Sequence, residues 1–196
     1  ERHGHTYFEF LDNIIREEGF DEFIALLRAQ PQRYRFHYEA RAHLKPLQIL
    51  RLWQAGMRRC QFGFEALSTG LLQRMGKGTT AMMNLEVMKI CAELEVPHNG
   101  NLITRFPGTT RDEIEETVRN MLRYASGYEP LTRSPFLLGR DCVVFRHPEE
   151  FPIANLRNHD DYKGVLPPEL FDRLEMFELS YDDRGLDVRY RIVRKH

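Results

Sequence analysis

Hydrophobic and polar residues follow two alternating periods along the N-terminal part of the chain. Short runs with the alternation typical of strands are each followed by a segment whose apolar residues recur every three or four positions, as in a helix. The predicted strands cover residues 7–11, 34–40, 57–64 and 97–104. The predicted helices cover residues 17–29, 47–55, 67–75 and about 80–94, with one more from residue 110. Strands that alternate with helices predict an α/β fold with a parallel sheet covered by helices.

Two of these helices have start signals and a predicted buried side. Thr79 or Thr80 is expected to cap the helix that ends near residue 94, and Thr110 with Glu113 has the spacing of a capping box. The residues expected to face the sheet are Met83, Val87, Ile90 and Leu94 in the first helix and Ile114, Val118, Met121 and Leu122 in the second.

The alternation stops after Tyr128, which predicts two parts, residues 1–128 and 129–196. Residues 131–138 can form one more short strand, and residues 139–168, rich in Pro, Asn, Asp and Arg, read as an extended arm before a short helix at Pro167 and Pro168. Residues 174–193 resemble two strands joined across a turn at 182–185. We therefore expect an irregular C-terminal extension that ends in a β-hairpin.

The composition is that of a globular protein without a strong charge. The 196 residues are 42% hydrophobic, and 28 basic against 29 acidic residues leave a net charge of −1. This balance gives no attraction to nucleic acid or to an anionic membrane. No apolar run reaches the roughly 20 residues of a membrane helix, and the first residues do not resemble a signal peptide. We expect a cytoplasmic protein with neither nucleic acid nor a membrane as its partner.

The three cysteines, Cys60, Cys91 and Cys142, are too far apart for a compact zinc or iron–sulfur motif. Their odd number also disfavours a secreted disulfide framework. Buried free thiols in a reducing compartment are the preferred interpretation. The histidines contain no His-Glu-x-x-His pattern, so we assign no metal ligand.

Four motifs occur in a fixed order between residues 38 and 110. They are YEARA at 38–42, GFEALST at 63–69, MGKGTT at 75–80 and NLITRFPGTT at 101–110. Predicted strands end at a carboxylate, an amide or a Pro-Gly turn, which would gather polar groups at one rim of a βα barrel, where barrel enzymes place their sites. The motifs resemble the radical S-adenosylmethionine (SAM) enzymes over about residues 7–123. The motif sequences are most similar to those of the cobalamin-binding-domain branch, which includes peptide maturases and relatives of anaerobic magnesium-protoporphyrin ester cyclases.

The resemblance implies a partial, TIM-like (βα) barrel whose first loop normally holds a Cys-x-x-x-Cys-x-x-Cys triplet. In the family that triplet ligates a 4Fe–4S cluster, which cleaves SAM to a 5′-deoxyadenosyl radical for methyl transfer or oxidative cyclisation. The triplet is absent from this sequence. Two accounts stay open. In the first, the chain is the C-terminal part of a larger oxidoreductase or methyltransferase and is inactive alone, with the cluster ligands and any cobalamin domain upstream. In the second, the chain is a cluster-less relative of the family.

Five residues match positions that contact the cofactor in the family. The resemblance places Glu39 and Glu65 at strand ends whose carboxylates meet SAM, Lys77 near its carboxylate, Asn101 near the ribose hydroxyls and Asp12 near its amino group. These residue types suit a zwitterion with a diol and a sulfonium. No catalytic residue is assigned. The chain departs from the family at Arg105, where glycine is common, and at Thr109, where glutamate is common.

Structural roles are alternatives for the same residues. Glu39 could simply pair with Arg41 or Arg58, Lys77 could be a solvated loop residue between two glycines, and Asn101 could only cap a turn.

Other functions remain open beside the enzyme. A non-catalytic scaffold of the same fold could dock a peptide through residues 139–196. A generic phosphate-binding barrel is disfavoured because MGKGTT lacks the spaced first glycine of a phosphate loop. The expected partners are upstream domains of the full-length protein and a peptide or tetrapyrrole-like substrate. The chain by itself is expected to self-associate or to cover its sheet edge with its C-terminal segment.

Overall fold

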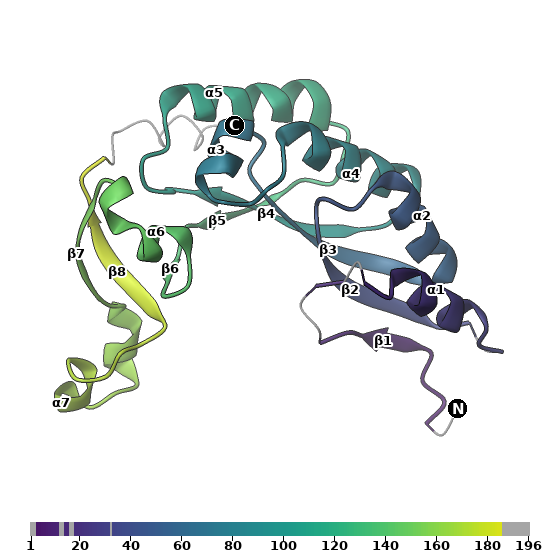
Figure 1. Ribbon diagram of the computed structural model, residues 1–196, viewed down its shortest axis with the longest axis horizontal. Coiled ribbons are helices and arrows are strands. Elements are labelled where there is room, and N and C mark those ends of the chain that lie inside the picture. The colour runs from purple at the N-terminus through teal and green to yellow at the C-terminus, as the bar shows by residue number, and fades with distance from the viewer. Residues whose placement is uncertain (1–2, 12–13, 16–17, 32, 186–196) are drawn as a thin grey trace. The chain divides into compact units, whose positions relative to one another are not determined.

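The computed structural model describes residues 3–11, 14–15, 18–31 and 33–185 of the chain. Strands and helices alternate through the N-terminal part, as the sequence predicts (Figure 1). Up to residue 135 the elements are β1 (Tyr7–Glu9), α1 (Phe20–Arg28), β2 (Arg35–Arg41), α2 (Pro46–Ala55), β3 (Met57–Glu65), α3 (Thr69–Arg74), α4 (Ala81–Glu93), β4 (His98–Thr104), α5 (Arg111–Asn120), a π-helical turn (Met121–Ala125) and β5 (Thr132–Pro135).

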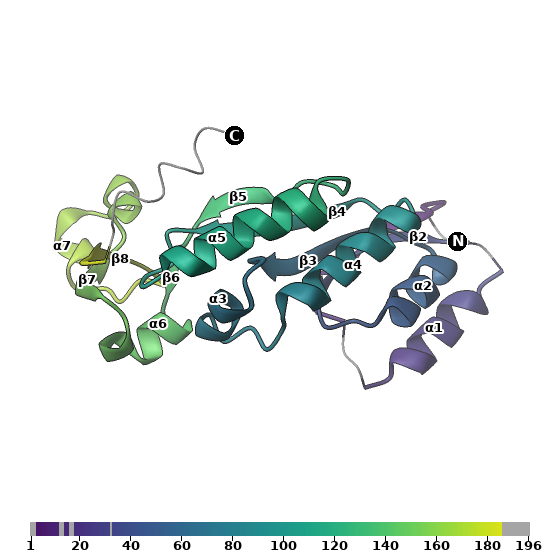
Figure 2. The same cartoon turned by 90° about the horizontal axis from the view of Figure 1, so that it is seen from above.

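Five strands form one sheet in the order β1-β2-β3-β4-β5. The pairs β1–β2, β2–β3 and β3–β4 are parallel, so each crossover between them contains a helix. Figure 2 shows α1, α2 and α4 side by side over the strands. One face of the sheet is therefore covered by helices.

The alternation of side chains within the strands separates an apolar face from a polar face. In β2, Phe36, Tyr38 and Ala40 are buried, whereas His37 and Glu39 between them are only half-buried. In β3, Cys60, Phe62 and Phe64 are buried in the same way, which confirms that Cys60 serves as a small core residue. Successive side chains of a strand point to opposite faces, so the half-buried polar residues lie on the face away from the helical core.

The buried sides of α4 and α5 differ from the predicted ones. Thr80 caps α4 as expected, its hydroxyl accepting from the Met83 amide at 3.2 Å. However, the completely buried side of α4 contains Asn84, Val87, Met88 and Cys91, while Met83, Ile90 and Leu94 are half-buried. The predicted stripe was wrong by about one residue because a polar residue, Asn84, lies at the centre of the contact with the sheet.

In α5 the most buried side chains are Glu113 and Thr117, not the predicted apolar stripe. Leu122 is exposed, and Ile114 and Val118 are half-buried. The reason is an ion pair, since Arg74 donates to Glu113 at 3.1 Å and draws the carboxylate into the contact with α3.

His98, at the start of β4, is a buried polar residue in this core. Its side chain is 3% exposed and packs edge-on against Phe64 at 5.1 Å between ring centroids. Among the described residues, neither ring nitrogen has a hydrogen-bond partner. Burial lowers the pKa of His98 from its ordinary 6.5, although the charge of Glu129 partly opposes the shift.

We expect His98 to make the protein less stable in mild acid. Below pH 6.5 the unfolded chain binds a proton at this residue that the folded chain does not, so the free energy of unfolding falls as the pH falls towards the lowered pKa. Above pH 6.5 this contribution is constant. Urea unfolding of the native protein and of His98→Asn between about pH 5 and about pH 8 measures it. A native-minus-variant difference that does not change with pH would contradict the expectation.

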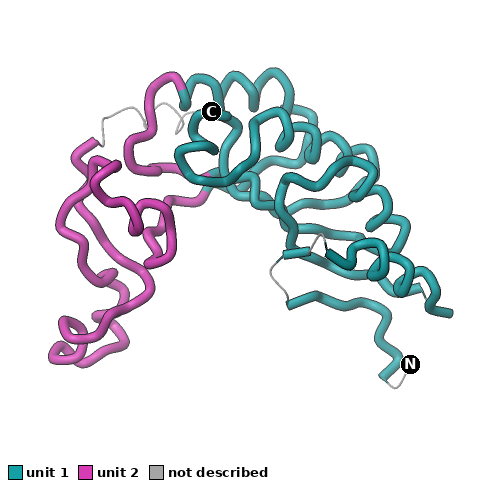
Figure 3. Tube along the Cα trace, viewed as in Figure 1, with its two compact units in different colours: residues 1–102, 113–133 teal, residues 103–112, 134–196 magenta. Residues whose placement is uncertain are grey.

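The chain divides into two compact units (Figure 3). The first contains residues 1–102 and 113–133, and the second contains residues 103–112 and 134–196. The division passes through β4, α5 and β5 because residues 103–112 pack with later parts of the chain. It reflects packing, and the domain boundary expected near residue 128 stays a prediction.

The second unit contains a three-stranded antiparallel sheet in the order β6-β8-β7. Strand β7 lies within the stretch predicted to be an irregular arm, where its polar composition concealed it. The short helix predicted at Pro168 is present. The elements are β6 (Leu138–Gly139), α6 (Val143–Arg146), a 3-10 turn (Pro148–Glu150), β7 (Ile153–Asn158), a second 3-10 turn (Asp160–Gly164), α7 (Pro168–Phe171) and β8 (Glu178–Asp183).

Strand β8 supplies the first strand of the predicted C-terminal hairpin. A turn follows it at residues 184–185, as expected, and the second predicted strand lies outside the described residues. Within the described parts of the chain, no helix has both the length and the apolar character needed to cross a membrane.

Candidate functional site

Polar side chains form rows across neighbouring strands on the face of the sheet away from the helices. The strand register produces these rows, because paired residues of parallel strands lie side by side. His37 Nδ1 lies 3.0 Å from Glu9 Oε1, and Arg59 donates to Asn99 Oδ1 at 2.9 Å. The rows are Glu9, His37 and Arg59, and then Glu39, Gln61 and Asn99.

Glu65 and Lys77 form an ion pair at the C-terminal end of β3. Lys77 Nζ lies 2.9 Å from Glu65 Oε1. The Lys77 side chain is 41% exposed and the Glu65 side chain is 17% exposed. The carboxylate lies over Gly63, where a Cβ would be 3.6 Å from Glu65 Oε1. Glu65 therefore points back over the polar face of the sheet. It carries a charge that is mostly shielded from solvent but paired.

The loop after α3 positions Lys77 for this contact. Gly76 and Gly78 both have a φ of 69°, a left-handed conformation that glycine adopts without a steric penalty. The Lys77 amide donates to the Leu72 carbonyl at 3.0 Å. Lys77 is thus held beside Glu65, which differs from the alternative of a lysine surrounded only by solvent.

Asn101 lies on the neighbouring strand close to the level of Glu65. It is half-buried between Gly100 and Leu102, both of which are buried, and the register pairs Gly100 with Phe62 and Leu102 with Glu65. Asn101 therefore shares the polar face. Glu65 and Lys77 lie at the C-terminal end of β3, and Asn101, in the middle of β4, lies on the same face close to that end.

Glu39 lies on the same face but at a different level. It pairs in register with Gln61, four residues before Glu65, which corresponds to about 13 Å along the strand. Arg58, one of its suggested partners, instead donates to the carbonyls of Trp53 and Met57 at 2.8 and 2.7 Å. Glu39 belongs with the second polar row rather than with the Glu65 group. Asp12, the fifth predicted residue, lies outside the described residues.

The sequence interpretation missed several polar residues of this face. These are Glu9, His37, Arg59, Gln61 and Asn99. The signal was present, because polar or small residues alternate with apolar residues over positions 35–40 and 59–64. The pairing between strands, which joins them into rows, could not be seen along one strand.

A profile of the radical SAM superfamily matches residues 6–121, which is more than half of the chain. The chain belongs to the radical SAM superfamily. The matched region contains β1 to α5 and all five predicted cofactor residues.

Relatives of the chain are remote or cover only part of it. A curated protein of Pyrococcus horikoshii, described as the uncharacterized methyltransferase PH0819, is 30% identical over 66 residues, 34% of this chain and 14% of that protein. The chain thus spans about one seventh of the length of that relative.

Two solved structures have a similar fold. HemN of Escherichia coli, the coproporphyrinogen III oxidase described as a radical SAM enzyme, has a TM-score of 0.51 at 13% identity, over 91% of this chain and 43% of that one. Elp3 of Methanocaldococcus infernus has a TM-score of 0.51 at 12% identity, over 76% and 42%. The likeness confirms a partial TIM-like α/β barrel, as the sequence predicted.

The cysteines of this radical SAM chain do not fit an iron–sulfur cluster, which requires thiolates. Cys60 and Cys91 are buried free thiols. Burial raises the pKa of Cys60 well above its ordinary value, with the charges of Cys91 and Glu39 adding to the effect. Burial likewise raises the pKa of Cys91 to about 12. Among the described residues, no group of three possible metal ligands includes a cysteine, and Cys142 alone cannot hold a cluster.

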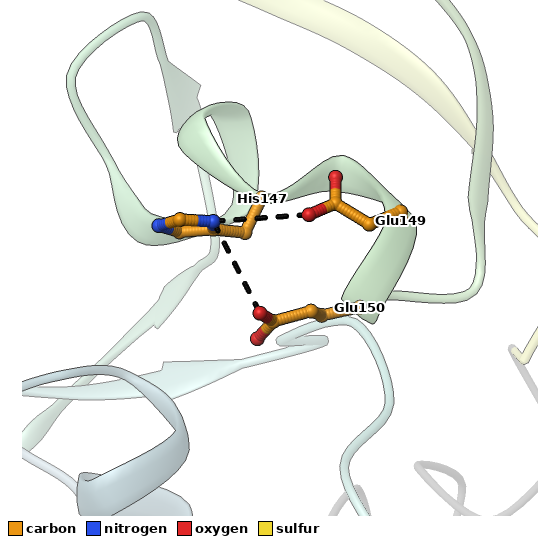
Figure 4. Close-up of side chains that lie close together, drawn as sticks. All are labelled: His147, Glu149 and Glu150. Atoms are coloured by element: carbon orange, nitrogen blue, oxygen red, sulfur yellow. Dashed lines mark ion pairs between the residues drawn. The ribbon is translucent and has the colours of Figure 1, made fainter.

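Two further features lie in the second unit. His147 points toward Glu149 and Glu150, with Nδ1–Oε1 distances of 3.8 and 4.0 Å (Figure 4), but all three side chains are exposed. A hollow of about 940 Å³ is lined by residues that include Arg140, Phe145, Lys163 and Phe171. None of the predicted cofactor residues lines it.

One departure from the family pattern is Arg105, which directly follows β4 and has a backbone conformation that suits glycine. Its φ is 60°, a left-handed conformation that costs an L-residue about 1–2 kcal/mol and suits the glycine that the family commonly has there. We expect Arg105→Gly to raise the free energy of unfolding by about 1 kcal/mol in urea titrations, since the added freedom of glycine when unfolded offsets part of the gain. Arg173→Gly, in an exposed turn, is the control. Equal effects of the two substitutions would contradict the expectation.

Proposed function

We propose that this chain forms the SAM-binding part of a radical SAM enzyme, with Glu65, Lys77 and Asn101 as the centre of the site. The observation that carries the proposal is the 2.9 Å ion pair of Glu65 and Lys77 at the C-terminal end of β3, with Asn101 on the stretch of β4 that pairs with this end. Barrel enzymes place their substrates and cofactors at this end of the strands. The family match to residues 6–121 supports the same reading.

The group of residues fits the charges and hydrogen-bonding groups of SAM. The Lys77 ammonium would bind the cofactor carboxylate, and Asn101 would hydrogen-bond the ribose hydroxyls. Glu65, already beside Lys77, would face the ribose or the methionine portion and offset the positive sulfonium. The mostly shielded position of Glu65 strengthens such contacts, because they are screened less than at an open surface.

Glu39 has a different part in this proposal. It lies about 13 Å from Glu65 along the strand, in a row with Gln61 and Asn99. At that level Glu39 would meet the far end of an extended cofactor or the substrate. Asp12 remains a proposed ligand of the cofactor amino group because of its position alone, near that of the family's Gly-Gly-Glu segment, a motif that this sequence does not contain as such.

The cluster would have to be held by residues outside this chain, since the three cysteines do not fit it. When bound, a 4Fe–4S cluster in this family supplies the electron that cleaves the sulfonium bond. The work of this chain is to bind SAM, to orient it and to shield it from water. We therefore propose that the chain is part of a longer enzyme.

Methyl transfer is the preferred reaction type of that enzyme. The relative from Pyrococcus horikoshii is described as a methyltransferase, and its 30% identity covers 34% of this chain. Cobalamin as a methyl carrier is consistent with the sequence motifs and belongs to the same proposal. Oxidative cyclisation of a peptide or tetrapyrrole-like substrate is the alternative that the test must separate.

The test uses the full-length protein, purified without oxygen and supplied with iron and sulfide. Incubation with dithionite and SAM that carries a deuterated methyl group is expected to produce 5′-deoxyadenosine, which mass spectrometry detects. Methyl transfer adds S-adenosylhomocysteine and a labelled product. Neither 5′-deoxyadenosine nor S-adenosylhomocysteine, from protein with a complete cluster and measurable SAM binding, would refute the enzyme proposal.

A further inference from the structure

We infer that Asn84, on α4, is a positioning residue that holds the Glu65 carboxylate in its binding orientation. This inference rests on the proposed function, in which Glu65 contacts SAM. Asn84 lies outside the four sequence motifs and on the face of α4 that packs against the sheet, where its side chain is completely buried.

The backbone at Glu65 has an unfavourable conformation. Glu65 has a φ of 60°, and the Ala66 amide bonds back to the Phe64 carbonyl at 2.7 Å, which closes a tight turn with Glu65 at its apex. A left-handed backbone conformation is sterically unfavourable for a residue other than glycine. Such a conformation persists only where surrounding contacts maintain it, and it recurs at functional sites.

Asn84 supplies contacts on both sides of this turn. Its Nδ2 donates to the Phe64 carbonyl at 2.8 Å and to the Ala66 carbonyl at 2.7 Å. The two acceptors belong to the residues immediately before and after Glu65. One amide nitrogen therefore bonds the peptide group that directly precedes Glu65 and the peptide group that follows Ala66, so it spans the turn from which the Glu65 side chain projects.

The side-chain oxygen of Asn84 indicates why an asparagine is present. Oδ1 is buried, and no described residue is its hydrogen-bond partner. A buried acceptor without a partner is destabilising, so an apolar residue would serve the packing of α4 better. The two donor bonds to the turn are what an apolar residue could not provide.

Other polar residues hold the loop beyond this turn but not Glu65 itself. Asn120 Nδ2 donates to the Leu67 carbonyl at 2.8 Å, and Ser68 Oγ donates to Glu116 at 2.6 Å. Asn120 is thus a matched control: it is also a helical asparagine that donates to a loop carbonyl, but it is bound two residues after Glu65.

The experiment compares Asn84→Asp, Asn84→Ser and Asn120→Asp in the full-length protein. Aspartate keeps the size of residue 84 but presents oxygen to both carbonyls, and serine keeps at most one donor. We expect Asn84→Asp to raise the dissociation constant of SAM about tenfold, with Asn84→Ser between it and the native protein. Asn120→Asp should leave affinity within about twofold. Equilibrium dialysis measures affinity, thermal unfolding measures stability, and crystal structures report φ at Glu65 and its distance to Lys77.

Three outcomes decide the inference. Weaker binding with a displaced Glu65 in Asn84→Asp alone supports it. A Glu65 side chain that does not move in Asn84→Asp overturns it. So does a loss of SAM affinity that is in the same proportion to the loss of thermal stability in Asn84→Asp and in Asn120→Asp. If Asn84→Asp does not fold, Asn84→Ser is judged by the same criteria. Glu65→Gln separates this result from the proposed function: if that substitution leaves SAM binding intact, the proposed site itself is wrong, whereas a displaced Glu65 in Asn84→Asp would still establish Asn84 as its support.

Discussion

Glutamine in place of Glu65 is expected to weaken SAM binding by about tenfold to about a hundredfold. A hydrogen bond to a charged group is worth about 1.5–3 kcal/mol, and each 1.4 kcal/mol corresponds to about tenfold in affinity. Glutamine has the size of glutamate, so the packing over Gly63 is kept, but the charge that pairs with Lys77 at 2.9 Å is lost.

Equilibrium dialysis of the reconstituted full-length protein with radiolabelled SAM measures this effect. Glu86→Gln is the control, because Glu86 lies on the exposed side of α4. The control should bind SAM as the native protein does, and thermal unfolding should show that both variants are folded. Equal affinity of Glu65→Gln and the native protein would remove Glu65 from the site.

Alanine at Gly56 is expected to destabilise the protein by about 3 kcal/mol. Gly56 joins α2 to β3 with a φ of 120°, and a Cβ there would overlap with the backbone carbonyl of Tyr34. The Gly56 carbonyl also accepts the Phe36 amide at 3.1 Å, so the chain cannot move away without breaking the start of β2. Backbone strain and overpacking each cost about 1–3 kcal/mol.

The free energy of unfolding in urea tests this expectation, with Gly127→Ala as the control. No atom of the described residues lies within 4 Å of a Cβ at Gly127, and its φ is not in the left-handed range. The control should change stability by less than about 1 kcal/mol. Similar values for the two glycines would mean that the approach of Gly56 to Tyr34 is not a rigid feature of the fold.

The alternation of strands and helices was readable because each element has its own hydrophobic period. The segments 34–40 and 57–64 were recognised as strands; β2 is shifted from the first by one residue at both ends, and β3 extends the second by one residue. Glu65, Lys77 and Asn101 were identified because they occupy positions in ordered motifs. For α4 and α5 the period was correct, but the buried side was not, because Asn84 and Glu113 enter the interior through specific partners.

The sequence by itself determined the α/β class, the family and three residues that lie together, because local periods and motif order are properties of one stretch of chain. Only the tertiary structure decided that Glu39 lies at another level from Glu65, since strand register depends on pairing between distant segments. It also decided the left-handed turn at Glu65 and its contact with Asn84. Such a conformation is unfavourable locally, so it arises only from contacts that the folded chain supplies.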